Sequence, residues 1–328
     1  MKRISKVIPW ILAFALLIFE GLFLLFGVAV GIIPLLTDSL TARAATIIYE
    51  LAYGLMYAFI FVAPVFFFRL ISRGKPIEPM YLERRLPRET VPYIFIGIAI
   101  ITAAAYLNSF IVSVFDYATF SEQVLWEQDV STNYQIVLMF FTVAVVPAFV
   151  EEFLFRGLVL SNLLPYGRTT AIFASALLFG VMHQNVEQLL YATVAGLVLG
   201  FLYVKTKSIW ICILLHFVNN FISVLQTVLS KRLSEFTANT VIAVLQGAIF
   251  VLGLLFAIVL LLRQTDRRKE ILKTGAFEID LSADPEYVAE EIPLSRRIRL
   301  FFTIPMIAFF VLCAIQMGAL VLAALLLL

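Results

Sequence analysis

The sequence is poor in charge. Aspartate, glutamate, lysine and arginine together make up 14% of its 328 residues, whereas hydrophobic residues make up 62%. A soluble domain of this length needs many more charged side chains to cover its surface, so most of the surface is expected to face lipid. We predict an integral membrane protein, with the lipid bilayer as its surroundings and without a nucleic-acid partner.

Cysteine and the common catalytic motifs are also scarce. The two cysteines, Cys212 and Cys313, each lie inside an apolar run, which excludes a disulfide framework and a Cys-x-x-Cys metal motif. There is no His-Glu-x-x-His, so the usual zinc-protease helix is absent. No Gly-x-Ser-x-Gly accompanies the histidines, which argues against serine catalysis. Cys212 stands four residues before His216, and a thiol nucleophile there is a minor alternative.

Long apolar runs are abundant, and a membrane-spanning helix needs about 20 apolar residues. Nine runs qualify, of which 169–185 is the shortest and weakest. They cover 8–36, 45–71, 92–115, 135–163, 169–185, 187–204, 208–229, 240–262 and 300–328. No run alternates in the manner of a barrel strand, so we predict an all-α fold, a polytopic transmembrane helix bundle of eight or nine spans.

The distribution of lysine and arginine predicts the orientation, because cytosolic loops carry an excess of both. If the N-terminus is cytosolic and the first span is not cleaved, the only lysines and arginines in the loops outside the cytosol are Arg43, Lys231 and Arg232. The one long connection, at about 264–299, is then a polar cytosolic loop. The short loops favour a bacterial or archaeal cytoplasmic membrane.

Ionisable groups inside the hydrocarbon cost roughly 2.5–3.5 kcal/mol each, so a chain keeps them when they pair or act. Several polar residues stand alone in a predicted span, and for these we expect a bracing role between helices: Glu20, Glu50, Asn108, Gln246 and Gln316. The stretch 147–220 differs, because it concentrates carboxylates, an arginine, asparagines and both histidines of the chain.

The first motif in that stretch is Glu-Glu-Phe-Leu-Phe-Arg at 151–156. Residues four apart share a helix face, so Glu152 and Arg156 are expected to form an internal ion pair. Neighbours on a helix point about 100° apart, which leaves Glu151 without a local partner. A buried glutamate beside another carboxylate suits a general base or acid.

Two further motifs follow on later helices. Phe-Gly-Val-Met-His ends at His183, and His-Phe-Val-Asn-Asn places His216 and Asn220 on one helix face. Glu151 and His183 could hold and deprotonate a water molecule, while His216 and Asn220 donate hydrogen bonds to the resulting oxyanion. Alternatively, Glu151, His183 and His216 could bind Zn²⁺ or another divalent metal, since all three are ordinary zinc ligands.

The three motifs, in this order on successive membrane helices, resemble the CPBP family of CAAX proteases and bacteriocin-processing proteins. The resemblance covers roughly 135–229. It implies that Glu151 is the catalytic glutamate, that His183 helps it to activate water, and that Glu152 and Arg156 are the supporting pair. It also implies a catalytic core of four central helices at 135–229, between N-terminal spans at 1–134 and C-terminal spans at 230–328.

The function predicted on this basis is an intramembrane endopeptidase. Its substrate would be a membrane protein or a lipidated peptide, with a CAAX-type prenylated peptide as one alternative. A non-catalytic membrane scaffold or bacteriocin-immunity protein of the same fold is the first competing hypothesis. A transporter is the second, because membrane carboxylates and histidines also build ion paths. The sequence leaves the substrate, the metal dependence and the oligomeric state open.

Overall fold

The protein is helical throughout its described parts. The computed structural model describes residues 7–37, 40–73, 79–84, 88–114, 132–274 and 293–327. Within these ranges the regular elements are all helices, and β-pairing is limited to one antiparallel bridge between Leu82 and Ser208. The predicted all-α class is therefore confirmed.

The long helices follow the apolar runs of the sequence. They are α1 (Ile8–Thr37), α2 (Ala42–Ile71), α3 (Val91–Val114), α9 (Val186–Thr206), α10 (Ile209–Arg232), α11 (Glu235–Thr274) and α13 (Ile304–Leu327), joined by the shorter α8 (Arg168–Met182), α12 (Leu294–Phe301) and the 3₁₀ turn η1 (Arg88–Thr90). The segment 133–166 is one helix in several parts: α5 (Asn133–Met139), η2 (Phe140–Val145), α6 (Val146–Glu152), η3 (Phe153–Leu160), α7 (Ser161–Leu163) and η4 (Leu164–Tyr166).

Seven described helices are long and apolar enough to cross a membrane, and an eighth is formed if α12 and α13, which meet at a 67° bend, count as one span. The chain is thus an integral, multi-pass membrane protein. The predicted count of nine spans is higher than this because it includes the run 169–185, which corresponds to α8. That helix has 15 residues, about 22 Å at 1.5 Å per residue, and is too short for a hydrocarbon core about 30 Å thick.

The helix 133–166 is wound unevenly on both sides of α6. The segments η2 and η3 are π-helical, and Pro147 lies between them, in the first turn of α6. Proline donates no backbone hydrogen bond, and an interruption of the regular ladder next to it is one of the usual causes of such irregular turns. π-helical turns are frequent at functional sites, and here they flank Glu151 and Glu152.

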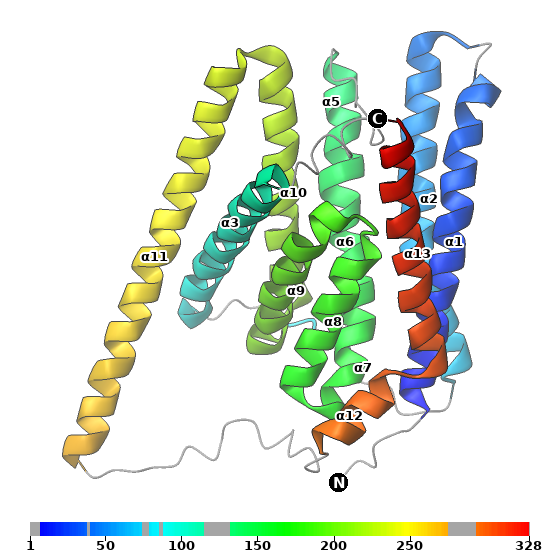
Figure 1. Cartoon of the computed structure of the whole chain (residues 1–328). Coiled ribbons are helices and arrows are strands. Elements are labelled where there is room, and N and C mark those ends of the chain that lie inside the picture. The colour runs from blue at the N-terminus through cyan, green and yellow to red at the C-terminus, as the bar shows by residue number, and fades with distance from the viewer. Residues whose placement is uncertain are drawn as a thin grey trace.

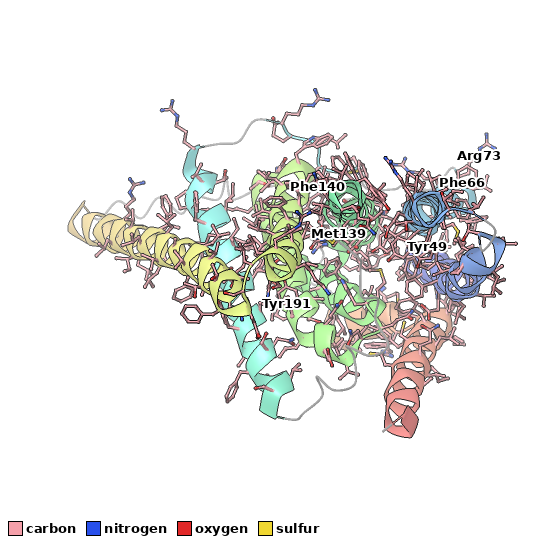
Figure 2. The ribbon with its side chains drawn as sticks, turned by 90° about the horizontal axis from the view of Figure 1, so that it is seen from above. Tyr49, Phe66, Arg73, Met139, Phe140 and Tyr191 are labelled. Carbon is pink, nitrogen blue, oxygen red and sulfur yellow. The ribbon has the colours of Figure 1, made fainter. Side chains whose placement is uncertain are left out.

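The helices form three groups (Figure 1). The central group contains the antiparallel pair α8 and α9, the helix α10 and the segment from α5 to α7. Helices α1, α2 and α13 pack together on one side, and α3 joins α9 to α11 on the other. Seen from above, this gives an elongated arrangement with α11 at one end and α1 and α13 at the other (Figure 2). The connection between α8 and α9 lies part-way along the neighbouring α10 (Figure 1).

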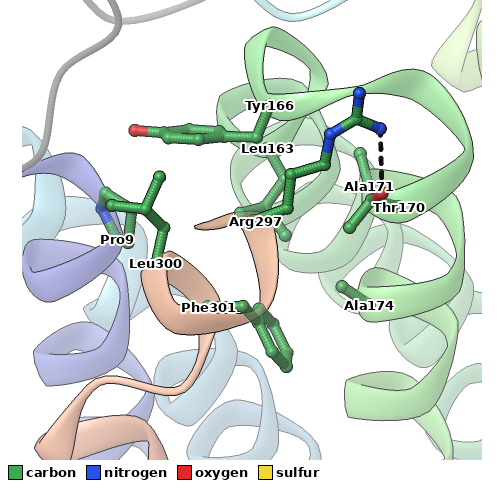
Figure 3. A pocket seen from close by; sticks show the side chains of 9 residues that line it. All are labelled: Pro9, Leu163, Tyr166, Thr170, Ala171, Ala174, Arg297, Leu300 and Phe301. Atoms are coloured by element: carbon green, nitrogen blue, oxygen red, sulfur yellow. Dashed lines mark hydrogen bonds between the residues drawn. The ribbon is translucent and has the colours of Figure 1, made fainter. Parts of the chain in front are cut away.

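The predicted polar loop at 264–299 is shorter than expected. Helix α11 continues to Thr274 and α12 begins at Leu294, because the residues after the apolar run include good helix formers. Residues 275–292 lie outside the described ranges. At α12 the guanidinium of Arg297 donates to the hydroxyl of Thr170 (3.5 Å), and Pro9, Leu300 and Phe301 line the same pocket (Figure 3).

Candidate functional site

The two glutamates of the first motif end α6 and are both buried, Glu151 at 3% and Glu152 at 0% exposure. The regular turn of α6 between the two π-helical segments points them to different neighbours. A carboxylate in an apolar interior must find donors or charges to compensate its burial. The contacts of each glutamate therefore indicate what the site can do.

Glu152 forms the ion pair predicted with Arg156. Nη1 of Arg156 donates to Oε1 of Glu152 at 2.8 Å, and neither side chain is exposed. The guanidinium also donates through Nη2 to the carbonyl of Gly196 on α9, and it lies 4.6 Å from the centre of the Phe179 ring. Arg156 therefore fixes Glu152 and joins α8, α9 and the helix 133–166.

His216 on α10 is the second partner of Glu152. Its Nδ1 lies 2.8 Å from the same Oε1 atom that Arg156 contacts. A carboxylate can only accept, so Nδ1 carries the proton and Nε2 is left available on the other side of the ring. That Nε2 faces Glu151, at 3.9 Å from its Oε2. His216 thus stands between the two glutamates, an arrangement that the helix-face reasoning did not foresee.

Glu151 also has a partner that sequence reasoning missed. The hydroxyl of Tyr57, on α2, donates to Oε1 of Glu151 at 2.5 Å. The other oxygen, Oε2, is buried and accepts no hydrogen bond from any described residue. The available signal was a stripe of tyrosines four residues apart, Tyr49, Tyr53 and Tyr57, which stack along one face of α2. That spacing alone did not say which helix the stripe would meet.

His183 caps the C-terminus of α8. Its Nδ1 donates to the carbonyl of Phe179 at 2.7 Å, which leaves Nε2 as the free ring nitrogen. Among described residues, Glu151 contacts Tyr57 and His216 and not His183. The ring of Phe179 lies between the two histidines, 4.9 Å from His183 and 5.8 Å from His216. The predicted cooperation of Glu151 and His183 in activating a water molecule stays a prediction.

A cavity joins the two histidines. It lies among α3, α8, α9 and α10, and the space inside it that the centre of a water-sized sphere can reach is about 40 Å³. The polar side chains that line it are His183, Tyr191, His216, Asn219 and Asn220. One water molecule needs about 10–15 Å³ of such space, so the cavity has room for a few water molecules.

The asparagines on the cavity wall are held in fixed orientations. Asn220 donates from Nδ2 to the carbonyl of Val143 at 3.0 Å and accepts from Nδ2 of Asn219 at 3.1 Å. Asn219 accepts in turn from the hydroxyl of Tyr191 on α9. Each amide NH₂ has two hydrogens, so each asparagine keeps one donor for a ligand in the cavity. Tyr191 is a second residue that the sequence motifs did not indicate.

The side chains do not form a metal-ligand set as they lie. Among the described residues, no three His, Cys, Asp or Glu side chains are grouped closely enough to hold one ion. Glu151 and His216 face each other, but the free nitrogen of His183 is not part of that pair. Cys212, the alternative nucleophile, is fully buried and its thiol faces the carbonyl of Leu199 at 3.3 Å. We therefore base no chemical step on a metal or on the thiol.

The three motifs all fall within one matched segment. Residues 133–222 match the family model of the type II CAAX prenyl endopeptidase Rce1-like proteins. The middle of this chain is Rce1-like in sequence. We refer to 133–222 as the Rce1-like segment; the family resemblance predicted from the motifs is confirmed over it.

A relative in the curated proteins points the same way. Over 95 residues the chain is 34% identical to the protein named "Putative membrane peptidase YdiL" of Bacillus subtilis (strain 168). The similarity covers 28% of this chain and 38% of that protein. No solved structure matches. Glu151, Glu152, Arg156, His183, His216 and Asn220 all lie inside the Rce1-like segment, whereas Tyr57 lies outside it.

Proposed function

We propose that this protein is an intramembrane peptidase in which Glu151 and His216 activate the attacking water. The observation that carries the proposal is the geometry of this pair. Oε2 of Glu151 is buried without a hydrogen bond, and it faces Nε2 of His216 at 3.9 Å. This distance is too long for a direct hydrogen bond but suits two groups that share one water molecule.

The groups around this pair prepare it for proton transfer. Because Glu152 accepts from Nδ1 of His216, the imidazole is held in one orientation with Nε2 toward Glu151. This is the role that an orienting carboxylate has beside a catalytic histidine. Arg156 in turn holds Glu152, and Tyr57 holds the other oxygen of Glu151. The water would thus be bound by two groups that have little freedom to move.

The proposed reaction is the addition of this water to a peptide carbonyl in the cavity. Glu151 takes one proton as the water oxygen bonds to the carbonyl carbon, and the carbonyl oxygen becomes an oxyanion. The remaining amide hydrogens of Asn219 and Asn220 lie on the cavity wall, where they can stabilise that charge. Glu151 then gives its proton to the departing amine nitrogen as the carbon–nitrogen bond breaks.

His183 has a different place in this proposal from the one that the motifs predicted. It lines the cavity opposite His216, with Nδ1 bound to the carbonyl of Phe179. We assign it to the substrate side of the cavity, where Nε2 accepts a hydrogen bond from the amide N–H of the bound peptide. The substrate class is a membrane-embedded or lipid-anchored peptide, since the cavity lies among membrane helices.

The test compares the wild type with Glu151→Gln and Glu50→Gln, each purified in detergent. Glu50 is another glutamate within a span, but it accepts from Thr142 and touches neither histidine. Each protein is incubated with membrane peptides and prenylated peptides, and the products are identified by mass spectrometry. We expect Glu151→Gln to lose cleavage by at least about 100-fold, the size of a general acid–base contribution. Glu50→Gln should keep its activity, and all three proteins should melt alike.

Retained cleavage in folded Glu151→Gln would overturn the proposed role of this glutamate. If the wild type cleaves no peptide, and the Glu151→Gln protein keeps the biological effect of the wild type in cells, the results would favour the competing hypothesis of a non-catalytic membrane scaffold. Parallel reactions with a chelator, followed by Zn²⁺ re-addition, measure the metal dependence of the reaction.

A further inference from the structure

A buried polar cluster joins the terminal helices to the turn that carries His183. Glu20 on α1 has no exposed surface, although α1 lies far from the Rce1-like segment in sequence. Both of its carboxylate oxygens accept from Nε2 of Gln184, each at 3.0 Å. The thiol of Cys313 on α13 lies 3.6 Å from Oε2. An ionisable residue inside a membrane bundle is rarely kept without a function or a partner.

Gln184 has an unusual backbone as well as an unusual partner. Its φ is +52°, in the left-handed region that residues other than glycine seldom adopt. Gln184 directly follows His183 and is itself 5% exposed. Its amide N–H donates to the carbonyl of Val181, and the next residue, Asn185, caps the start of α9. The conformation of Gln184 therefore determines where α8 stops and where His183 points.

Gln184 follows the C-cap of α8, a position where a left-handed residue often ends a helix, and its side-chain bonds to Glu20 hold it there. A buried amide without an acceptor would cost free energy, so Gln184 keeps its side chain where Glu20 can accept from it. The left-handed backbone is tolerated because these contacts hold it. Removing the carboxylate would release the amide, and the turn would relax toward an ordinary conformation. His183, one residue away, would move with it.

We infer that Glu20 is a positioning residue, which acts through Gln184 to fix His183 at the edge of the cavity. The inference deepens the proposed function, on which it rests, by assigning a role to helices outside the Rce1-like segment. Helices α1 and α13 are then part of the peptidase site and not only its surroundings. The sequence-based interpretation of Glu20, a brace between two helices, does not predict an effect on one histidine alone.

The chain offers a direct test, because it contains only two histidines. Protein labelled with ¹³C and ¹⁵N in histidine gives ring signals from His183 and His216 alone, and a His183→Gln sample assigns them. We expect Glu20→Gln to shift or broaden the His183 signal and to leave that of His216 in place. This readout needs no substrate, so it is independent of whether the protein cleaves peptides.

Two further variants distinguish a specific effect on the position of His183 from a general destabilisation of the fold. Gln184→Gly removes the side chain while permitting a positive φ, and it should change the same signal as Glu20→Gln. The double exchange of Glu20→Gln with Gln184→Glu restores an amide facing a carboxylate and should return the His183 signal toward that of the wild type. Gln246→Leu is the control, because the hydrogen bond that Gln246 on α11 accepts comes from Tyr106 on α3, and neither helix carries this turn.

Activity supplies the second measurement where the wild type cleaves a peptide. We expect Glu20→Gln to lower kcat/KM for that peptide about 10-fold while the melting temperature stays within a few degrees. An unchanged His183 signal in folded Glu20→Gln and Gln184→Gly overturns the inference, as do equal changes at both histidines. If the variants change the NMR signal of His183 selectively but the wild type cleaves no peptide, the result supports the positioning contact. It then counts against the proposed peptidase function and not against the contact.

Discussion

At the scale of single residues, Tyr57 has a role that one substitution can isolate. Tyr57→Phe removes only the hydroxyl that donates to Glu151. A hydrogen bond to a charged group contributes about 1.5–3 kcal/mol, so we expect kcat to fall about 10- to 100-fold while KM stays nearly constant. Steady-state kinetics with a peptide that the wild type cleaves in the proposed assay would measure both constants. Tyr106→Phe removes a comparable hydroxyl that donates to Gln246 and should leave both constants unchanged.

An equal fall in activity for both tyrosine variants would mean that the hydroxyl of Tyr57 stabilises the fold and has no particular effect on Glu151. A rise in KM with constant kcat would assign Tyr57 to substrate binding instead. Either result would remove Tyr57 from the proposed set of groups that prepare Glu151.

Among single-residue contacts, the sequence predicted one within a helix and missed those between helices. The contact between Glu152 and Arg156 was predictable, because a spacing of four on a helix decides it. The contacts of Glu151 with Tyr57 and of Glu152 with His216 join residues 94 and 64 positions apart. Such contacts depend on how the helices pack, which no local spacing contains. The catalytic roles of Glu151, His183, His216 and Asn220 remain predictions.

At the scale of elements, the α8–α9 pair depends on a glycine. A Cβ placed on Gly180 would lie 2.0 Å from Oγ1 of Thr193 and 2.8 Å from the carbonyl oxygen of Leu189. The second contact is with backbone, so α9 itself would have to move. Overpacking of this kind typically costs about 1–3 kcal/mol. Gly180→Ala should therefore lower the midpoint of thermal unfolding, measured in detergent.

Gly247→Ala is the matched control, since nothing lies within 4 Å of the Cβ that it adds on α11. Alanine also favours the helix over glycine, so this variant should be as stable as the wild type or more so. Equal midpoints for the two alanine variants would show that α8 and α9 can separate at low cost.

Element boundaries were predicted well where the helix was regular. Helices α3 and α10 differ from the predicted spans 92–115 and 208–229 by at most three residues at either end. The ends of α8 also lie within three residues of the predicted span 169–185. The sequence did not predict the π-helical segments on either side of Pro147, because the apolar run continues through them without a visible change.

At the scale of the whole molecule, the arrangement of basic residues predicts a cytosolic N-terminus. The start of α1 and the helix α12 lie at one end of the bundle, and the connection between α10 and α11 lies at the other (Figure 1). Arg296, Arg297 and Arg299 belong to α12, and such residues favour the cytosolic side. We expect a membrane-impermeant maleimide to label Ser234→Cys from outside intact cells and Ser295→Cys only after the cells are opened.

The two native cysteines are buried and should contribute little background in that experiment. Labelling of Ser295→Cys in intact cells, with protection of Ser234→Cys, would reverse the orientation. The membrane-spanning helices were largely predictable because hydropathy acts along the chain, whereas the orientation stays a prediction. The lateral grouping of α1, α2 and α13 against the centre was not predictable, because lipid-facing and protein-facing surfaces have similar apolar compositions.

In the proposed peptidase, the short α8 would limit how deep in the membrane the cleaved bond can lie. Its start lies at one end of the bundle and its 15 residues carry His183 no more than about 22 Å from there. An extended peptide covers about 3.3 Å per residue, so roughly seven residues reach the same depth. Helix α8 would thus limit cleavage to peptide bonds that lie no more than about 22 Å from that end of the bundle, which is about four turns of helix or seven extended residues.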